Sequence, residues 1–273
     1  MTAHVSALHL YPIKGCRGIA VNSAEVDALG LVGDRRFLIT DPTGKFLTQR
    51  SHPVMALIGT ALTPDDLTLT FKDRAPLAVR RAPDPDAPLL TVEVWSSTGL
   101  CAEDCGDEAA DWLSAILGSP VRLARIGSAF HRPVKPSKAQ PGDVVNFADG
   151  YPLLIAGTAS LGDLNDRLIA QGEAPIPIDR FRPNVVVEGA APFAEDTWPR
   201  IRIGNVVLRA AGDCVRCIVI TTDQETTERG PEPLRTLAAY RRQAGGQGVI
   251  FGQNLIHESK TGTLRVGDRV ELL

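Results

Sequence analysis

Two cysteines with an arginine between them form the most reactive combination of side chains in this sequence. Cys214 and Cys217 are separated by two residues, and Arg216 directly precedes the second thiol. A neighbouring cation favours the thiolate, which is the form of cysteine that binds metals. Residues 218–222 are a β-branched run, so we expect a strand there, with Cys217 on its edge and Cys214 in the loop before it. This arrangement makes Cys217 a candidate metal ligand.

Three other interpretations of these thiols stay open at the level of sequence. Cys217 could be an inert buried thiol, as free cysteines often are. The C-x2-C spacing also occurs in thioredoxin-like redox pairs, but there the motif opens a helix, whereas here a strand is expected. Cys101 and Cys105 form a C-x3-C pair that could complete a four-thiolate zinc site, although this pair lies far away in sequence and opens a helical pattern.

A set of cations lies beside glycine or proline at the ends of predicted strands. Each cation alone could be a solvated surface charge. At such positions, however, a side chain can point into a cleft, and together the set would form a cradle for an anion. The members are Lys14, Arg35, Arg36, Arg180 and Arg182.

A strand-to-helix junction supplies a second candidate anion site. Residues 151–156 predict a buried strand, and a helix is expected to begin at Thr158 and to end at Gly172. The first turn of a helix has free backbone N–H groups that attract anions. We therefore expect Thr158 and Ser160 to face a phosphate.

The composition limits the class of protein. The 273 residues are 44% hydrophobic, which is enough for one large or two modest cores, and five sparse cysteines argue against a disulfide scaffold. A net charge of -3 with scattered cations makes nucleic acid an unexpected partner. No leader peptide and no membrane-spanning stretch are recognisable, so we expect a cytoplasmic protein without a membrane partner.

Short strands dominate the predicted elements, which indicates an α+β, mostly β fold with a few short helices. In the first part we expect a helix at 104–117, preceded by the strands 5–10, 24–29, 37–40, 46–48, 56–62, 67–71, 77–79 and 89–95. Residues 127–149 show no periodicity and are expected to be a mobile loop at the domain boundary that shapes an entrance. In the second part we expect a hairpin at 201–208, a helix at 234–242, a strand at 249–254 and a terminal hairpin at 264–273.

A series of short motifs in a fixed order resembles the MOSC proteins, in particular the β-barrel-plus-MOSC group that includes the mitochondrial amidoxime-reducing component and bacterial relatives. The resemblance covers nearly the whole chain. Its motifs are YPIKGC at 11–16, GDRRF at 33–37, YPLLI at 151–155, ASL at 159–161, FRPN at 181–184, CVRC at 214–217, TTD at 221–223, EPLRTL at 232–237, FGQ at 251–253 and VGD at 266–268.

The resemblance implies an N-terminal β-barrel-like domain at 1–130, a MOSC β-barrel domain at 131–273 and a molybdenum cofactor (Mo-molybdopterin). In this family the second cysteine of the motif binds molybdenum, which here is Cys217. The implied catalytic residues are Cys217, Arg216 and Asp213. The implied cofactor-binding residues are Lys14, Gly15, Arg35, Gly157, Thr158, Ala159, Arg182, Asn184, Val215, Arg216 and Cys217.

The activity implied by the resemblance is the two-electron reduction of N-hydroxylated compounds such as amidoximes, hydroxylamines and N-hydroxylated bases. Asp213 or Asp223 would supply protons. No iron–sulfur module follows Leu273, so a separate cytochrome b5-like, ferredoxin or flavin protein is expected to supply electrons. Two alternatives remain: a cofactor carrier or sulfur-transfer module with a cysteine persulfide, and a non-catalytic thiol or metal-binding protein.

Overall fold

The computed structural model describes residues 3–135, 137–243, 245–246 and 248–273. Two continuous apolar runs form the centre of its eight-stranded sheet. β12 (Leu153–Gly157) and β13 (Val185–Glu188) are parallel, and the crossover between them contains helix α2 (Thr158–Ala170). Every residue of β12 is buried, as expected for a strand covered on both faces. Leu164 and Leu168 of α2 are buried on one side of this sheet.

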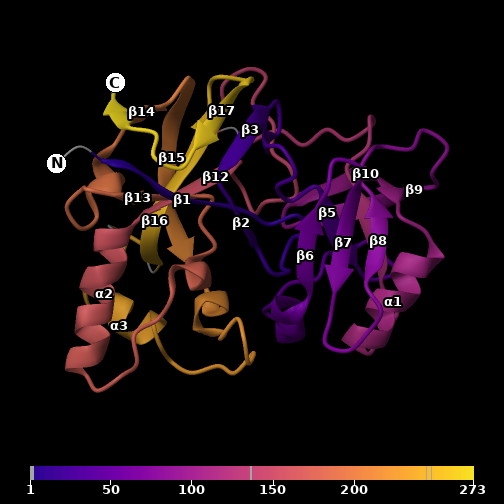
Figure 1. The fold of residues 1–273 in the computed structure, drawn as a ribbon, viewed down its shortest axis with the longest axis horizontal. Helices are drawn as coiled ribbons and strands as arrows, with labels where there is room; N and C mark the ends of the chain where they lie inside the picture. The colour runs from indigo at the N-terminus through magenta and orange to yellow at the C-terminus, as the bar shows by residue number, and fades with distance from the viewer. Residues whose placement is uncertain (1–2, 136, 244, 247) are drawn as a thin grey trace.

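The larger lobe contains this sheet, helices α2 and α3 (Leu234–Tyr240), and a smaller three-stranded sheet (Figure 1). The large sheet has the order β18-β14-β15-β16-β12-β13-β1-β2. Its other strands are β1 (His4–Leu10), β2 (Ile19–Val21), β14 (Arg200–Ile203), β15 (Val206–Arg216), β16 (Val249–His257) and β18 (Val270–Leu272). The smaller sheet contains β3 (Ser23–Asp27), β4 (Gly30–Leu31) and β17 (Gly262–Arg265).

The smaller lobe consists of two short sheets and helix α1 (Asp107–Leu117), which pack around a shared apolar core (Figure 1). One sheet has the order β5-β11-β10-β9 and contains β5 (Phe37–Thr40), β9 (Leu89–Val94), β10 (Ser97–Asp104) and β11 (Arg122–Arg125). The other contains β6 (Gly59–Leu62), β7 (Asp66–Thr70) and β8 (Leu77–Arg80). The predicted α+β, mostly β class is confirmed.

The start of the chain belongs to the larger lobe. β1 pairs with β13, about two thirds of the chain away, and β3 pairs with β17, which lies nearly at the other end of the chain. Ile13 and Cys16, between β1 and β2, already pack into the core of the smaller lobe. The chain returns to the larger lobe with β2, β3 and β4, enters the smaller lobe again with β5 and leaves it after β11. The predicted sequence domains 1–130 and 131–273 are therefore interlocked in space.

Two sequence-based expectations near the C-terminal half are wrong. Residues 218–222 do not form a strand: β15 ends at Arg216, and the short 3-10 helix η4 (Ile218–Thr221) follows. The β-branched residues fold this way because Ile220 and Thr221 pack inward beside α3. Residues 264–273 do not form a hairpin either, because β17 pairs with β3 and β18 pairs with β14.

The segment 127–149 has no regular element among its described residues, as predicted, but it is not a free loop. Arg132 is buried and donates hydrogen bonds to the carbonyl oxygens of Asn146 (2.8 Å), Ala148 (2.5 Å) and Asp149 (3.0 Å), and to Ser97 Oγ (3.1 Å). Burial lowers the pKa of Arg132 to about 10, which still leaves it charged at neutral pH. Pro136 of this segment lies outside the described residues. Arg132 thus fixes the backbone around Asp149.

None of the helices in the described ranges combines the length and the hydrophobicity needed to cross a bilayer.

We predict that Arg132→Met destabilises the protein by about 3 kcal/mol, because three carbonyl groups lose a charged donor inside the fold. Arg202→Met is the matched control, since Arg202 pairs with Glu271 on the surface and should contribute less than about 0.5 kcal/mol. Urea unfolding of both variants measures the difference. An equal decrease in the free energy of unfolding in both variants would show that Arg132 does not anchor the segment.

Candidate functional site: a cleft between the lobes

A cleft at the junction of the lobes collects most of the residues singled out in the sequence. Its walls come from both lobes and from the crossing segments of the chain. The residues from the predicted set are Lys14, Gly15, Arg35, Arg182, Asn184, Cys214, Val215, Arg216 and Cys217. Other lining residues include Thr48, Gln49, Arg50, Trp95, Asp149, Tyr151 and Phe181.

The end of β15 places four consecutive residues, Cys214 to Cys217, along one wall of the cleft. In a regular strand, alternate side chains point to opposite faces. The pairing of β15 with β16 is irregular between Asp213 and Val215, and such a bulge redirects the side chains that follow it. Cys217 then has extended backbone and precedes η4 directly. Both thiols are free and partly accessible.

Arg216 contacts Cys214 rather than Cys217. Its Nη1 lies 2.7 Å from Cys214 Sγ, and its Nη2 donates a 2.6 Å hydrogen bond to the carbonyl oxygen of Phe181. From the sequence, Arg216 was expected to favour the thiolate of its neighbour, Cys217. Instead, the Arg216 guanidinium is held by Cys214 and by the Phe181 carbonyl. None of the described residues makes a hydrogen bond to the Cys217 sulfur.

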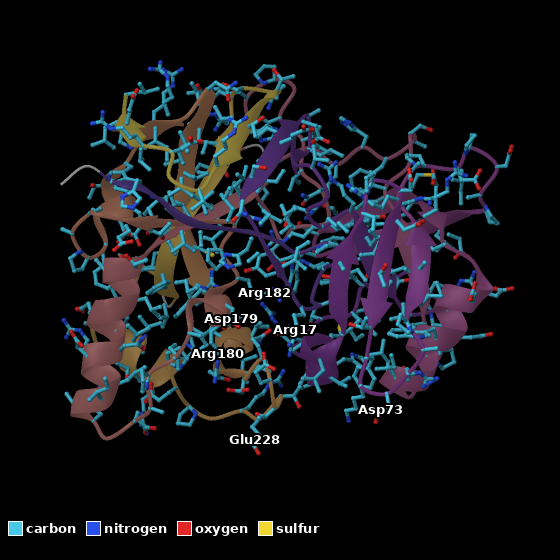
Figure 2. All side chains as sticks on the ribbon, viewed as in Figure 1. Arg17, Asp73, Asp179, Arg180, Arg182 and Glu228 are labelled. Atoms are coloured by element: carbon cyan, nitrogen blue, oxygen red, sulfur yellow. The ribbon has the colours of Figure 1, made fainter. Side chains whose placement is uncertain are left out.

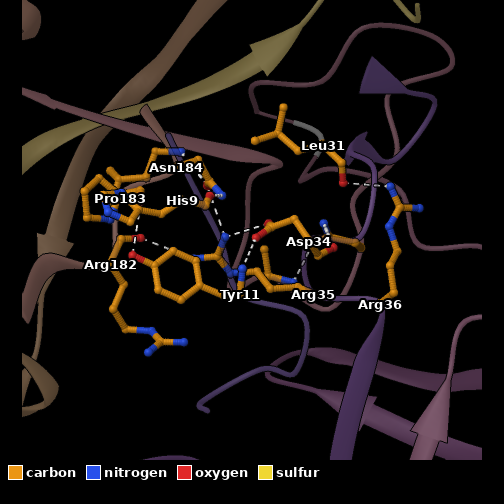
Figure 3. Close-up of polar contacts among 12 residues, drawn as sticks. His9, Tyr11, Leu31, Asp34, Arg35, Arg36, Arg182, Pro183 and Asn184 are labelled. Carbon is orange, nitrogen blue, oxygen red and sulfur yellow. Dashed lines mark hydrogen bonds and ion pairs between the residues drawn. The ribbon is translucent and has the colours of Figure 1, made fainter. Parts of the chain in front are cut away.

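The buried ring of Tyr11 supports the guanidinium groups of two residues that line the cleft, Arg35 and Arg182 (Figure 3). The Cζ atoms of Arg35 and Arg182 lie 4.6 Å and 4.2 Å from the centre of its ring. The Tyr11 hydroxyl donates to the carbonyl oxygen of Pro183 (3.1 Å), and its backbone N–H donates to Asp34 Oδ1 (2.8 Å). The buried ring therefore holds two positive charges at a fixed separation.

Arg35 has its own partners inside this network. Its Nη1 lies 2.6 Å from Asp34 Oδ2 and 3.0 Å from Asn184 Oδ1 (Figure 3). Burial would lower the pKa of Arg35, but Asp34 outweighs this effect and raises it. Asn184 also accepts from the N–H of Leu154 and donates to the carbonyl oxygen of His9, so its amide is used to position Arg35.

Arg182 has no acidic partner in the described part of the chain. It lies at the junction of the lobes (Figure 2), and its buried Nη2 has no hydrogen-bond acceptor. Burial, followed by the charge of Arg35, lowers the pKa of Arg182, although contact with Tyr11 partly opposes this. Its φ of 55° is a left-handed conformation that is uncommon outside glycine. A half-buried cation with a buried donor that lacks an acceptor is suited to bind an anion.

Lys14, Asp149 and Trp95 form a third group on the cleft wall. Lys14 Nζ and Trp95 Nε1 both donate to Asp149 Oδ1, the latter at 2.9 Å. Burial lowers the pKa of Lys14, while the Asp149 carboxylate opposes that effect. Gly15 follows Lys14 with a φ of 86°, and a Cβ there would lie 2.7 Å from Met55 Cε. Glycine is thus required for the turn that brings Lys14 to the cleft.

Two cations of the predicted cradle lie outside the cleft lining. Arg36 donates to Asp27 Oδ1 (2.7 Å) and to the carbonyl oxygen of Leu31, and Arg180 donates to Asp223 Oδ2 (2.7 Å). The two candidate proton donors are absent from the lining as well. Asp223 pairs with Arg180 and accepts N–H groups of its own turn, while Asp213 lies close enough to raise the pKa of Asp196.

The turn formed by Gly157, Thr158 and Ala159 is also outside the lining of the cleft. The start of α2 is covered by the buried carboxylate of Glu195, which accepts from the Gly157 N–H (2.9 Å) and from Ser160 Oγ (2.7 Å). A Cβ at Gly157 would lie 2.9 Å from Ser160 Oγ and 3.0 Å from Glu195 Oε2, so glycine permits this close approach. The expectation that Ser160 faces a phosphate is wrong, because an internal carboxylate takes that position.

Sequence reasoning missed three cleft residues: Arg50, Trp95 and Asp149. None of the three belongs to a motif of the sequence. Arg50 lies with its Cζ 4.5 Å from the centre of the Trp95 ring. Trp95 has a φ of 54° in the turn between β9 and β10. The one available signal was the position of Asp149 at the end of the aperiodic segment, directly before β12.

A zinc site made from four cysteines is not formed. No group of three or more histidine, cysteine or acidic side chains is arranged to hold a metal within the described ranges. The C-x2-C motif is followed by η4 and not by the expected strand. This element is only four residues long and is not an α-helix.

Comparisons with known proteins agree with the two-part organisation. Residues 2–120 match the MOSC N-terminal beta barrel domain, and residues 142–271 match the MOSC domain. The chain is 36% identical to mitochondrial amidoxime-reducing component 1 of Mus musculus over 285 residues and to that of Homo sapiens over 288 residues. Each alignment covers 98% of this chain and 82% of the relative.

A longer protein is similar to this chain over part of its length. The molybdenum cofactor sulfurase of Oryza sativa subsp. japonica is 31% identical over 281 residues, which covers 93% of this chain and 32% of that protein.

We predict that Arg182→Gln weakens the binding of inorganic phosphate about tenfold or more, because charge-assisted hydrogen bonds contribute roughly 1.5–3 kcal/mol. Arg36→Gln is the control, since Asp27 already neutralises that side chain. Isothermal titration calorimetry on protein freed of bound small molecules measures both affinities. If Arg36→Gln weakened binding as much as Arg182→Gln, the anion site would have to lie elsewhere.

Proposed function

Because the chain belongs to the MOSC family, in the group that contains the mitochondrial amidoxime-reducing components, we propose that it binds a molybdenum cofactor in the interlobe cleft and reduces N-hydroxylated compounds there. The observation that carries this proposal is that Arg182, whose buried Nη2 has no acceptor among the described residues, and an accessible thiol, Cys217, line the same cleft. An anionic organic group that also carries a soft metal would use both.

The basic end of the cleft supports binding of an anionic pterin phosphate. Lys14, Arg35 and Arg182 come from segments that are distant in sequence and converge on this cleft. Arg35 and Lys14 already have carboxylate partners, whereas Arg182 lacks one among the described residues. Arg182 is therefore the residue whose charge most needs an external anion, and the other two would add donors around it.

The thiol end of the cleft supports the role of Cys217 as metal ligand. A thiolate is a soft ligand and is suited to a metal that is also bound by sulfur. Arg216 is engaged by Cys214 and by the Phe181 carbonyl, so this guanidinium does not compete for the Cys217 sulfur. Val215 and Arg216 line the wall beside it and would contact the bound group.

When bound, the cofactor supplies two-electron chemistry at molybdenum, and the protein supplies binding and orientation. In the proposed reaction the N–O bond of the substrate breaks and the oxygen leaves as water. A separate cytochrome b5-like, ferredoxin or flavin protein would supply the electrons. Because Asp213 and Asp223 lie outside the cleft lining, neither has support from this geometry as a proton donor.

The second candidate function is a cofactor carrier or sulfur-transfer module. The similarity to the rice molybdenum cofactor sulfurase favours it, because that relative shares the region containing the thiols. In this case one of the cysteines would carry a persulfide, and substrate reduction would not occur.

We predict that Cys217→Ala abolishes retention of molybdenum, whereas Cys214→Ala retains it, because Arg216 keeps its bond to the Phe181 carbonyl in the latter. Protein is loaded with cofactor, and its metal content is measured by mass spectrometry. Loss of molybdenum in Cys214→Ala but not in Cys217→Ala would contradict the assignment of the ligand.

Turnover distinguishes the two candidate functions. We predict that molybdenum-loaded protein reduces benzamidoxime to benzamidine when an artificial donor supplies electrons. Product formation is followed by chromatography, and Cys217→Ala serves as the inactive control. Loaded protein without turnover would favour the carrier over the reductase.

A further inference from the structure

We propose that Asp149 is the substrate-binding residue that accepts N–H groups from the carbon–nitrogen end of an amidoxime and of its amidine product. This proposal rests on the proposed function and assigns a substrate class and a recognition group to the same cleft. Among the cleft-lining residues that the structure describes, Asp149 is the only carboxylate, while five are basic: Lys14, Arg35, Arg50, Arg182 and Arg216.

The two oxygen atoms of Asp149 have different surroundings. Lys14 Nζ and Trp95 Nε1 both donate to Oδ1, whereas Oδ2 has no hydrogen-bond partner in the described chain. The side chain is 72% exposed, in contrast to 9% for Lys14. One oxygen therefore fixes the orientation of the carboxylate, and the other remains available as an acceptor. Arg132 fixes the backbone at the same residue through the Asp149 carbonyl.

The carboxylate is ionised at neutral pH. Desolvation by itself would raise the pKa of Asp149, but Lys14, the Trp95 indole and Arg35 outweigh it and hold the pKa well below the usual range. An ionised carboxylate only accepts hydrogen bonds. It therefore favours a substrate with N–H donors over one with acceptors at the same position.

The proposed reaction changes the charge of the substrate in the direction that a carboxylate favours. A neutral amidoxime takes up two electrons and three protons, the N–O bond breaks, and the products are an amidinium cation and water. The electrons come from the separate donor protein of the proposed function. Positive charge thus develops on the two nitrogens, and a fixed anion beside them stabilises the later stages more than the initial substrate.

The smaller lobe provides an aromatic surface next to Asp149. The Trp95 ring contacts Phe46 edge to face, with 4.8 Å between ring centres, and the Arg50 guanidinium lies over the same indole. Trp95 is 38% exposed. Such a surface suits an aryl group attached to the amidine carbon, so we infer that aryl amidoximes are the preferred substrates.

A purely internal role for Asp149 makes a different prediction. If the carboxylate only neutralises Lys14, its removal frees a cation, which strengthens phosphate binding and leaves amidine binding unchanged. The substrate-binding role instead predicts loss of amidine binding.

The test compares benzamidine with benzamide, a neutral analogue of similar shape, by isothermal titration calorimetry on cofactor-loaded protein. We expect benzamidine to bind more tightly than benzamide in the wild type, and Asp149→Asn to weaken benzamidine about tenfold or more because a charge-assisted contact is lost. Asp149→Glu should recover part of the affinity. The control is Asp73→Asn, a change at an exposed loop of the smaller lobe (Figure 2).

Steady-state kinetics give a second readout. Asp149→Asn should lower kcat/KM for benzamidoxime about tenfold and should lower kcat/KM for hydroxylamine, which has no amidine nitrogen, by less. Unchanged benzamidine affinity in a folded Asp149→Asn variant would overturn the proposal, even if the enzyme reduces benzamidoxime. Conversely, Asp149-dependent benzamidine binding in a protein that reduces nothing would support the recognition site and contradict only the proposed reductase function.

Discussion

The arrangement of the cleft depends on two guanidinium groups that share one buried aromatic ring. Arg35 and Arg182 both lie over Tyr11, and only Arg35 has a carboxylate partner, Asp34. Burial of an uncompensated charge is costly, and it persists only where the surrounding structure enforces it or a ligand neutralises it. Both arginines also have left-handed backbone conformations, with φ values of 47° and 55°. Uncommon conformations of this kind cluster at ligand sites.

The shared position of Arg35 and Arg182 over Tyr11 requires three segments of the chain to meet at one point. Tyr11 lies in the segment between β1 and β2, and Arg35 lies in the segment that leads from β4 to β5, so both segments reach the same point from the larger lobe. Arg182 arrives from the segment between α2 and β13, where Asn184 links it to β12 and to the end of β1. The bulged end of β15 brings the thiols to the same cleft, where Arg216 donates to the carbonyl oxygen of Phe181, the residue before Arg182. A ligand that contacts both Cys217 and Trp95 would touch both lobes.

Much of this fold could be predicted from hydrophobic patterning, but the register and pairing of its strands could not. The helix at Thr158, the β14 and β15 hairpin and the aperiodic segment before β12 all followed from local signals. The element after Cys217 did not, because β-branched residues also fit a buried 3-10 turn when tertiary packing requires it. Equally, β17 pairs with β3 across nearly the whole chain, and β18 pairs with β14 across three intervening strands of the sequence, so neither pairing follows from local signals.

For the candidate site, sequence motifs identified the residues that have an unusual type beside unusual neighbours. They did not identify the residues that only the fold brings to the cleft. Lys14, Arg35, Arg182 and the two cysteines were recognisable from their neighbours. Asp149 and Trp95 were not, because an aspartate in an aperiodic loop and a tryptophan after a strand are common. Only the convergence of the lobes places them at the same cleft, where they make a hydrogen bond of 2.9 Å.

The central claim is that one anionic, metal-bearing ligand spans the cleft from the Arg35 and Arg182 pair to Cys217. A crystal structure of cofactor-loaded protein, with anomalous scattering recorded at the molybdenum absorption edge, tests it most directly. The account predicts an anomalous peak bonded to Cys217 Sγ and a phosphate in contact with Arg182. A metal bonded to Cys214 instead, or a phosphate bound outside the cleft, would contradict it.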